Sequence, residues 1–334
     1  MDRYVCEPLS ETSYDTWDEF VGRSPQGTVF NTTVWYQVLH EVLGKHWILY
    51  GCHKKGSLCG GCIIVRSRRA GLDLLLPPLF TPYQGFVLRP RLSPRTSAEV
   101  EDVLRLVSEM EKEIRRRHSM AVLVHHPTMM ELRPLVWSNW EAIPRYTFRL
   151  RLDPSPEAFA ALRYDVRNRV RRAHDYGLSV RAVADIADYA PLYAASYGRH
   201  GQAPPVPVDL LTKWFLRLRA EGVARGFLAV DSQERPHALR IVIIDGRMAY
   251  DWVAGADTTL IKQGAPSLLV WRINEELSRE CDYLDFMGAN TPSIAAFKAG
   301  FGAPLTMYWE TRMFRFPLLR ALLSWKERIF HLRQ

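Results

Sequence analysis

The sequence predicts an α/β fold with mixed sheets, organised as two similar halves. Some segments carry apolar residues at helical spacing, and others form short apolar runs bounded by turn residues. These segments follow a similar order before and after the proline-rich stretch Asp153-Pro154-Ser155-Pro156. The chain has 334 residues, which suits two domains of roughly 150 residues each better than one small domain.

The first half reads as helices, a meander of strands, and then a long helix followed by a strand. The second helix starts near Thr32, directly after Asn31, whose side chain suits an N-cap. In the long helix, Val103, Val107 and Met110 keep helical spacing. The expected elements are two helices within 14–43, a hairpin at 47–53 and 58–68, a strand at 72–79, a helix at 97–118, and strands at 120–124 and 146–152.

The second half repeats this order. A strand meander followed by a strand–helix–strand crossover is the order of a GNAT-type acyltransferase domain. The sequence therefore predicts two tandem GNAT-like acyltransferase domains, at 1–152 and 153–315, and a basic amphipathic helix at 316–334. The expected elements of the second half are a helix at 155–176, a strand at 178–184, helices at 186–198 and 208–221, a hairpin at 226–230 and 238–244, a strand at 248–253, a helix at 266–280, a strand at 283–286, a helical turn at 294–298 and a strand at 305–314.

The charge balance permits an anionic substrate or partner but does not indicate a DNA-binding protein. The net charge is +8, and 36 of the 44 basic residues are arginine. Arginine makes planar, bidentate contacts with phosphate and carboxylate groups. The alternative source of the arginine excess is a GC-rich genome.

The chain is expected to be cytoplasmic, and its cysteines are not expected to form a scaffold or a metal site. No apolar run approaches the ~20 residues that a membrane helix needs, and the N-terminus lacks a signal peptide. Five cysteines do not form a disulfide scaffold in a chain of this length. Cys59 and Cys62 are spaced as in a zinc site, but no second such pair exists, so we interpret them as small strand residues and expect no metal.

Three segments resemble the Fem-type tandem-GNAT transferases. The first is Phe30-Asn31-Thr32-Thr33-Val34-Trp35, and the second is Arg167-Asn168-Arg169-Val170-Arg171-Arg172-Ala173 followed by Gly177-Leu178. The third joins Asp285-Phe286-Met287-Gly288-Ala289-Asn290 to Ala296-Phe297-Lys298-Ala299-Gly300-Phe301-Gly302. That group contains peptidoglycan-bridge aminoacyltransferases and relatives tied to exopolysaccharide or exported-protein systems. In its peptidoglycan members, an aminoacyl-tRNA donates an amino acid to an amine of a cell-wall precursor.

The resemblance implies that Lys298 lies at the active centre. Its ammonium would bind a phosphate or stabilise the oxyanion of a tetrahedral intermediate, and the alternative is a surface lysine. In the same motif, Asn290 and Phe297 are expected to contact substrate. The long coiled-coil arm of some family members is absent here, which weakens the expectation that a full tRNA docks.

Two aspartates are candidate general bases, because aminoacyl transfer to an amine must dispose of a proton. Asp251 lies on the strand that corresponds to the catalytic strand of the fold, and Asp285 follows the short strand. Their alternative roles are a solvent-facing strand residue and a structural turn cap. The loop Ile261–Ser267 would cradle a pyrophosphate in acyl-CoA enzymes, but it has one glycine, and Pro266 removes an N–H donor.

Further substrate contacts are expected on two other surfaces. Arg163, Arg167 and Arg171 stand four residues apart and would form one helical ridge, either for a diphosphate or tRNA backbone or as a solvated face. Trp35, Tyr83 and Gln84 are expected to line an acceptor site, with inter-domain packing as the alternative. His125 and His126 are interpreted as a loop pair.

The sequence thus predicts an acyltransferase with no bound cofactor that uses aminoacyl-tRNA or acyl-CoA as co-substrate. The expected acceptor is an amine or hydroxyl of a nucleotide- or lipid-linked envelope precursor. The alternatives are an acyl-CoA-dependent N-acyltransferase and a non-catalytic tandem-GNAT binding module. The segment 316–334 is expected either to contact anionic lipid at the inner face of the membrane or to dock on the protein.

Overall fold

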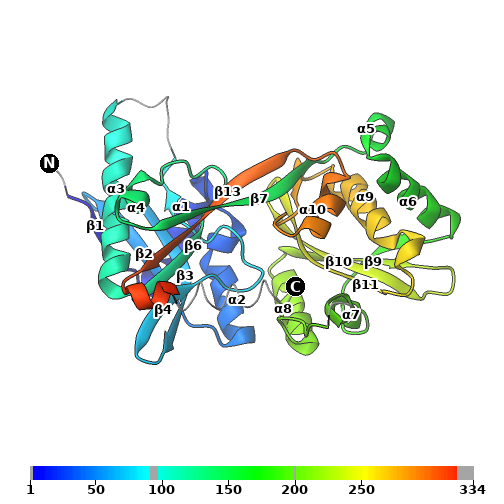
Figure 1. The fold of residues 1–334 in the computed structure, drawn as a ribbon, viewed down its shortest axis with the longest axis horizontal. Coiled ribbons are helices and arrows are strands. Elements are labelled where there is room, and N and C mark those ends of the chain that lie inside the picture. The colour runs from blue at the N-terminus through cyan, green and yellow to red at the C-terminus, as the bar shows by residue number, and fades with distance from the viewer. Residues whose placement is uncertain (1–2, 91–96, 199–200, 322–334) are drawn as a thin grey trace. The chain divides into compact units, whose positions relative to one another are not determined.

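Two compact units make up the chain, and each is built on a mixed sheet flanked by helices. In a computed structural model, residues 3–90, 97–198 and 201–321 are described. The first unit comprises residues 1–144 and 308–334, and the second comprises 145–307 (Figure 1). The sequence placed the boundary near Asp153 and assigned the last strand to the second half. The division found here differs because that strand pairs with β6 of the first unit from Glu310 to Phe314.

The first unit carries strands in the order β1-β2-β3-β4-β6-β13. The parallel pair β4–β6 is joined by the long helix α3, as in a strand–helix–strand crossover. The strands are β1 (Val5–Pro8), β2 (Trp47–Lys54), β3 (Ser57–Arg69), β4 (Leu72–Leu76), β5 (Val87–Leu88), β6 (Met120–Val124) and β13 (Leu305–Phe314). The helices are α1 (Tyr14–Arg23), α2 (Thr33–Leu43), α3 (Ser97–Arg117) and α4 (Arg133–Trp137), with 3₁₀ turns at Glu11–Ser13 and Val29–Asn31.

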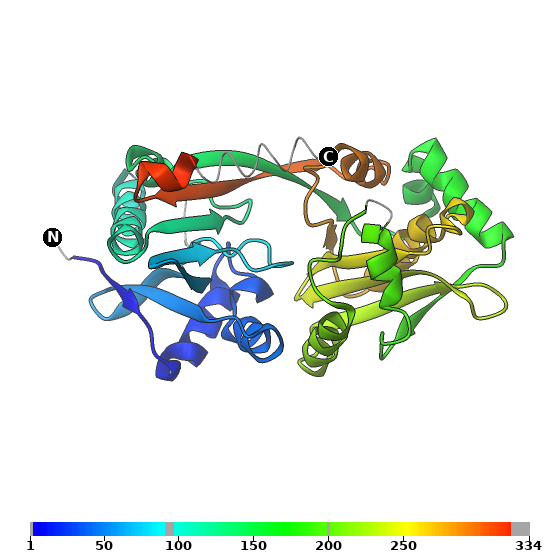
Figure 2. The same cartoon turned by 60° about the horizontal axis from the view of Figure 1, so that its bottom comes forward.

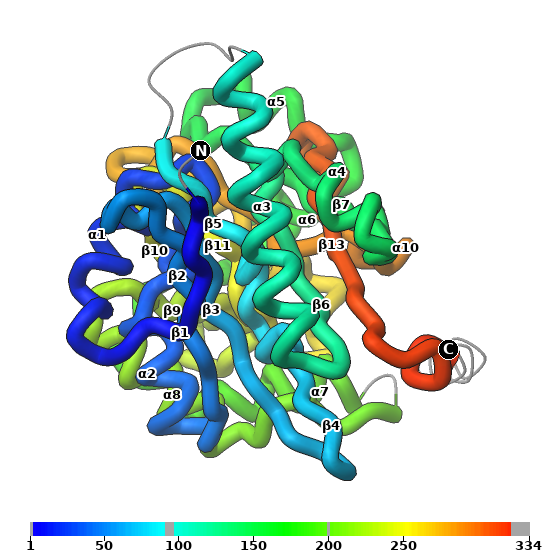
Figure 3. The backbone as a smooth tube through the Cα atoms, turned by 90° about the vertical axis from the view of Figure 1, so that its left-hand side faces the viewer, coloured from blue at the N-terminus to red at the C-terminus, as the bar shows by residue number. Residues whose placement is uncertain are grey.

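Alternation along β2 and β3 separates the two faces of this sheet. Cys62 and Ile64 pack with Val107 and Met110 of α3, which runs along the sheet (Figure 3). On the other face, Trp17 of α1 lies against Gly61, where a Cβ atom would come within 2.6 Å of the indole ring. Glycine at this position therefore allows a fully buried tryptophan to pack directly on the strand.

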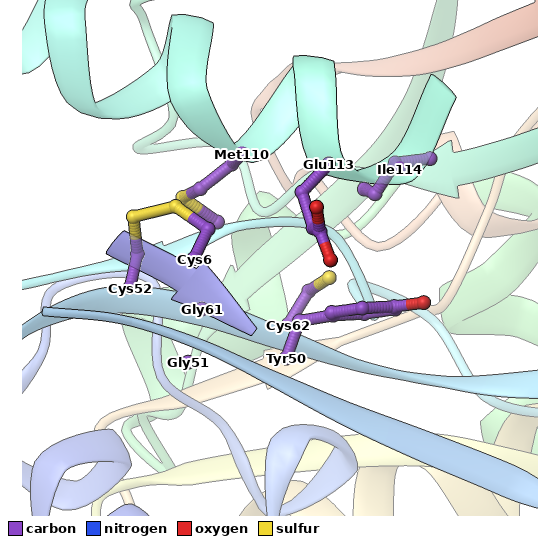
Figure 4. Close-up of a pocket in the computed structure, with 9 residues that line it drawn as sticks. All are labelled: Cys6, Tyr50, Gly51, Cys52, Gly61, Cys62, Met110, Glu113 and Ile114. Carbon is purple, nitrogen blue, oxygen red and sulfur yellow. A yellow bond between two sulfur atoms is a disulfide. The ribbon is translucent and has the colours of Figure 1, made fainter. Parts of the chain in front are cut away.

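Cys6 and Cys52 form a disulfide between the neighbouring strands β1 and β2. Figure 4 shows it beside a cavity of about 10 Å³ that is also lined by Cys62 and Met110. Composition did not predict this bond. Cys59 and Cys62 are free and buried on β3, in line with their interpretation as strand residues.

The second unit carries strands in the order β7-β12-β11-β10-β9-β8. Helices α6 and α9 cover one face, and α7 and α8 pack on the other (Figure 2). The strands are β7 (Glu141–Arg151), β8 (Ser179–Val183), β9 (Ala224–Val230), β10 (Pro236–Asp245), β11 (Met248–Ala256) and β12 (Tyr283–Asp285). The helices are α5 (Pro156–Ala161), α6 (Tyr164–Asp175), α7 (Pro191–Gly198), α8 (Val208–Ala220), α9 (Ala265–Leu277) and α10 (Pro292–Ala299), with a 3₁₀ turn at Ile261–Gln263.

The helix predicted over 155–176 is wrong in one respect, because it is divided into α5 and α6. Leu162 and Arg163 between them are extended, with ψ angles of 144° and 140°. The Arg163 N–H, which would continue a single helix, instead donates to the Gly300 carbonyl at 2.9 Å. A contact with α10 thus breaks the helix.

The predicted amphipathic helix at the C-terminus falls mostly outside the described residues. A helical turn is described at 317–321, and 322–334 lie beyond it. Among the described residues, no helix has both the length and the apolar character needed to cross a bilayer.

Candidate active site

The parallel strands β11 and β12 pair over a short stretch and then take different neighbours. Their register runs from Met248 opposite Tyr283 to Tyr250 opposite Asp285. Strand β11 continues to Ala256, whereas the chain after β12 turns to β7, where the Phe286 N–H donates to the Phe148 carbonyl at 2.9 Å. Asp251 and Asp285 both stand at the point of divergence.

A β-bulge lies directly beside Asp251. Val242 of β10 faces Asp251, and Ile241 faces Val253, so Trp252 is an extra residue on β11. The Trp252 ring packs edge-on against Trp214 of α8, with centroids 4.9 Å apart. A bulge changes the local twist of a strand, and this one lies directly next to Asp251.

Asp251 is paired with Arg240, a residue that the sequence analysis did not single out. Nη1 of Arg240 donates to Oδ2 of Asp251, and the two side chains are only 6% and 4% exposed. Within the described residues, Oδ1 of Asp251 and Nε of Arg240 are buried without a hydrogen-bond partner. The pair therefore keeps one acceptor and one donor that the surrounding protein does not satisfy.

Asp285 is fully buried and receives hydrogen bonds on both carboxylate oxygens. Oδ1 accepts from the Thr147 hydroxyl at 2.7 Å and from the Met287 N–H at 2.8 Å. Oδ2 accepts from Nε of Arg149 at 2.9 Å. A carboxylate held by three donors is suited to fixing the turn after β12 rather than to taking up a proton.

The ammonium of Lys298, on α10, lies against this turn. Nζ donates to the Phe286 carbonyl at 2.6 Å and to the Gly288 carbonyl at 2.7 Å. Burial lowers the pKa of this amine; the charge of Asp251 opposes that effect, the charge of Arg240 adds to it, and the charge of Asp285 opposes it. The structure thus brings Lys298, Asp251 and Asp285 within electrostatic reach of one another, and their catalytic roles stay predictions.

Aromatic rings surround the lysine helix. Phe297 is partly buried against the core of the second unit, and its ring meets Phe301 edge-on at 5.3 Å. Phe301 in turn lies 5.7 Å from Phe286. Oδ1 of Asn290, also named from the sequence, accepts from the Tyr146 N–H at 3.0 Å and joins the turn to β7.

The three predicted ridge arginines are engaged by the protein itself. Arg163 precedes α6 rather than lying on it; it pairs with Asp165 and donates to the Ala296 carbonyl at 3.0 Å. Arg167 donates to the Leu162 carbonyl at 3.2 Å, and Arg171 stacks on the Phe159 ring at 5.8 Å. Arg163 therefore joins α10 to α6, and a single three-residue ridge is not formed.

The predicted acceptor-site residues Trp35, Tyr83 and Gln84 are all at most 1% exposed in the first unit. Nε1 of Trp35 donates to the Thr81 hydroxyl at 3.0 Å. The Tyr83 ring packs against Tyr308 at 5.4 Å. Burial gives these side chains a packing role within the first unit, which differs from the inter-domain packing considered from the sequence, and their place in an acceptor site stays a prediction.

In the first unit, the segment that follows β4 covers the end of the parallel strands β4 and β6. Strand β4 stops at Leu76, and the chain beyond it returns so that the Gly85 N–H donates to the Val124 carbonyl of β6 at 2.7 Å. Three residues later, Leu88 pairs with Gly60 of β3. This segment thus fills the position that corresponds to the divergence of β11 and β12.

The loop before α9 offers few amide donors. Gly264 has φ of 90°, and a Cβ there would lie 2.2 Å from the Arg169 carbonyl oxygen of α6. The Ser267 and Leu268 N–H groups both donate to the Gly264 carbonyl, and Pro266 has none. Among the described backbone bonds, the first turn of α9 leaves the Ala265 N–H as its donor for an anion.

The residues that the sequence analysis missed are Arg240, Thr147 and Arg149. Each reaches its partner across strands, and Thr147 and Asp285 are 138 positions apart. A signal was present for Arg240, since a charged residue sits within the otherwise apolar strand Ala238–Ile244.

In the described part of the chain, no cluster of three or more His, Cys, Asp or Glu side chains is arranged to hold a metal.

Comparisons with known proteins bear on the fold. Residues 160–299 match the acetyltransferase (GNAT) domain family. The structure is similar to FemX, with a TM-score of 0.68 and 13% identity, over 91% of this chain and 96% of that one. It is also similar to the C-terminal domain assigned to a lysylphosphatidylglycerol synthetase of Agrobacterium fabrum, with a TM-score of 0.58 and 11% identity, over 95% and 96% of the two chains.

A third similar structure is a tandem GNAT protein from the clavulanic acid biosynthesis pathway. Its TM-score is 0.55 and its identity 11%, over 94% of this chain and 99% of that one. No curated protein matches this sequence significantly. The α/β fold with two tandem GNAT-like domains and the resemblance to Fem-type tandem-GNAT proteins, both predicted from the sequence, are confirmed.

Proposed function

We propose that this chain, which has the tandem-GNAT fold of the Fem-type proteins, transfers an acyl or aminoacyl group to an amine or hydroxyl of a cell-envelope precursor. The fold is that of acyltransferases, and transfer is therefore the expected reaction class. Similarity to FemX and to a lysylphosphatidylglycerol synthetase domain supports an aminoacyl donor and an envelope acceptor.

The observation that carries this proposal is the placement of Lys298. Each neighbouring carboxylate is held by an arginine: Asp251 by Arg240, and Asp285 by Arg149. The ammonium instead contacts two neutral carbonyl oxygens, and within the described residues its third N–H is left for a substrate oxygen. A partly buried ammonium that forms no direct ion pair stabilises the negative charge that develops on a carbonyl oxygen during acyl transfer.

In the proposed reaction, the acceptor nitrogen or oxygen attacks the carbonyl carbon of the donor ester or thioester. The new C–N or C–O bond forms, the bond to the leaving group breaks, and the departing oxygen or sulfur takes up a proton. The acceptor loses one proton, for which a base is needed. Asp251 suits this role better than Asp285, because its Oδ1 has no hydrogen-bond partner within the described structure, whereas both oxygens of Asp285 are occupied.

The loop before α9 favours aminoacyl-tRNA over acyl-CoA as the donor. A coenzyme A pyrophosphate binds several amide N–H groups at a helix N-terminus. Here Pro266 lacks an N–H and the Ser267 N–H is bonded to the Gly264 carbonyl. The acyl-CoA-dependent N-acyltransferase remains the second candidate, since the GNAT domain match covers this loop.

The test offers the purified full chain two labelled donors in parallel, a mixture of aminoacyl-tRNAs and acetyl-CoA. The acceptors are a nucleotide-linked peptidoglycan precursor and phosphatidylglycerol vesicles. Label transferred from aminoacyl-tRNA to either acceptor supports the proposal, and transfer from acetyl-CoA alone supports the second candidate. If neither donor is consumed, the chain is a non-catalytic binding module and the proposal is overturned.

A vesicle arm of the same experiment tests the C-terminal segment. From its sequence, we expect 316–334 to bring the chain to anionic lipid. Salt-sensitive sedimentation with phosphatidylglycerol vesicles that is lost on truncation after Arg315 supports this. Failure of the full chain to sediment at low salt contradicts it.

A further inference from the structure

We infer that Thr147 is a positioning residue, whose hydroxyl fixes the turn that holds the Lys298 ammonium. The inference rests on the proposed function, since it concerns the same site. Thr147 lies on β7 and is fully buried. Neither the sequence motif nor the resemblance assigns it a role.

Two hydrogen bonds connect Thr147 to Lys298 through Gly288, and a third ties the Thr147 hydroxyl to Asp285. The Thr147 hydroxyl donates to Oδ1 of Asp285 at 2.7 Å. The Thr147 hydroxyl oxygen also accepts from the Gly288 N–H at 3.1 Å. The Gly288 carbonyl then accepts from Nζ of Lys298 at 2.7 Å. One hydroxyl therefore links the buried carboxylate to the residue that binds the ammonium.

The turn needs this support because its backbone is in an unfavourable conformation. Met287 has φ of 53° and Gly288 has φ of 99°. A non-glycine residue in the left-handed region is disfavoured unless its surroundings hold it there. The Met287 N–H is held by Oδ1 of Asp285 at 2.8 Å, and the Gly288 N–H is held by Thr147.

Strand β7 fixes the same turn on both sides of this contact. The Phe286 N–H donates to the Phe148 carbonyl at 2.9 Å, and the Ala289 N–H donates to the Tyr146 carbonyl at 2.6 Å. Gly288 lies between these anchors, and its N–H is held by the Thr147 side chain rather than by the backbone of β7. Loss of the hydroxyl therefore releases the N–H of the Met287–Gly288 peptide, whereas the Gly288 carbonyl shares its peptide with the Ala289 N–H and keeps that anchor.

The consequence for chemistry is the direction of the third Lys298 N–H. Two acceptors, the Phe286 and Gly288 carbonyls, define how the ammonium is turned. An oxyanion donor works only when it is held close to its productive geometry. Releasing the Gly288 N–H loosens the backbone beside one of these two acceptors and lowers transition-state stabilisation more than substrate binding.

The test compares two matched variants of the full chain. Thr147→Val keeps the β-branched shape but has no hydroxyl, and Thr147→Ser keeps the hydroxyl and loses a methyl group. We expect Thr147→Val to lower kcat about tenfold with KM changed less than twofold, and Thr147→Ser to stay within about threefold of the wild-type kcat. Equal losses in both variants would show that shape matters rather than the hydroxyl, and would overturn the inference.

A second readout does not depend on activity. Limited labelling with an amine-reactive anhydride, read by mass spectrometry, measures the reactivity of Lys298 against the exposed Lys262 as internal reference. In Thr147→Val the Lys298 signal should rise several-fold relative to Lys262, and in Thr147→Ser it should not. If Thr147→Val does not fold, Thr147→Ala replaces it in both measurements.

Failure of this inference is distinguishable from failure of the proposed function. Unchanged Lys298 labelling in Thr147→Val overturns the positioning role, whatever the transfer assay shows. A wild-type chain that consumes no donor overturns the function, whereas the labelling comparison still decides whether Thr147 holds the lysine.

Discussion

Arg240 and Asp251 form an ion pair that is almost completely removed from solvent, across the hairpin of β10 and β11. Transfer of two charges from water into a protein interior costs several kcal/mol per ion, and mutual attraction offsets this only in part. Such a pair is weak evidence of stabilisation. Its place beside the β-bulge and Lys298 indicates that it serves the site, because it holds a carboxylate there in a fixed direction.

Removing one member of this pair should destabilise the fold strongly. Asp251→Ala leaves the Arg240 guanidinium buried without its carboxylate, and we expect a loss of about 3–5 kcal/mol in the free energy of unfolding. Urea denaturation measures it. The double variant Arg240→Met/Asp251→Leu removes both charges and should regain most of that loss. A double variant as unstable as Asp251→Ala would show that charge pairing is not the cause.

Replacing the lysine should affect turnover far more than stability. Lys298→Met removes the ammonium but keeps much of the aliphatic side chain, and we expect turnover to fall about 10²–10³-fold, the scale of losing one oxyanion donor. Lys213→Met, at an exposed position of α8 in the same unit, is the matched control and should leave turnover unchanged. Near-wild-type turnover in folded Lys298→Met would remove the lysine from the proposed mechanism.

The glycine of the loop before α9 should be irreplaceable for two separable reasons. Gly264 and Gly222 both have positive φ, of 90° and 76°, but only at Gly264 would a Cβ collide with backbone, at 2.2 Å from the Arg169 carbonyl oxygen. Gly222→Ala should cost about 1 kcal/mol for its backbone conformation alone. Gly264→Ala should cost about 3 kcal/mol, because overpacking adds to that cost.

Thermal or urea unfolding of the two alanine variants gives this difference directly. Equal destabilisation would mean that α6 moves away from the loop without penalty.

Local pattern predicted the longer helices and strands of this fold, apart from the single helix over 155–176. The apolar spacing of α3 predicted a helix at 97–118, and the structure has it at Ser97–Arg117. The break at Arg163 was not predictable, because the Arg163 N–H donates to the carbonyl of Gly300, a residue far along the chain. Propensity describes a residue with its near neighbours, and a distant carbonyl overrides it.

The residues of the candidate site likewise include some that the local sequence could indicate and others that it could not. Lys298 and Asp285 belong to one continuous motif and were found together, and Asp251 was found by its place on the strand. Thr147 could not be found, because its role depends on the side-by-side placement of β7 and the turn at Gly288. The buried state of Trp35 was also beyond the sequence, since an aromatic residue on a helix suits either a core or a binding site.

The bond between Cys6 and Cys52 should contribute measurably to stability. It closes a loop with a sequence separation of 46, and removing a crosslink of that length typically costs about 2–4 kcal/mol. Dithiothreitol should therefore lower the urea midpoint of the wild-type chain. In Cys6→Ala the midpoint should already be lower and should not respond to the reductant.

Mass spectrometry without reductant provides the direct check, since the bond removes two hydrogen atoms. Full labelling of Cys6 and Cys52 by a thiol reagent in the unreduced, denatured chain would contradict the disulfide.

Stability should fall as the pH is lowered from neutrality, and His125 should account for part of this. Its ring is fully buried; Nε2 lies 2.8 Å from the Thr311 hydroxyl, and Nδ1 has no hydrogen-bond partner within the described residues. Burial lowers the pKa of His125 to about 3, from an ordinary value of 6.5. Below pH 6.5 the unfolded chain therefore binds a proton that the folded chain excludes, and the stabilisation present above that pH is progressively lost.

The expected slope is about 1.4 kcal/mol per pH unit below pH 6.5, or roughly 2 kcal/mol between pH 6.5 and pH 5. His125→Gln places an amide near the position of Nε2, retains a partner for Thr311 and cannot titrate, so the variant should lose this part of the slope. The exposed His46→Gln serves as control and should keep it. Urea unfolding at half-unit pH steps measures all three chains. Parallel wild-type and His125→Gln curves over this range would show that His125 takes up its proton in the folded state, and the buried neutral imidazole would have to be abandoned.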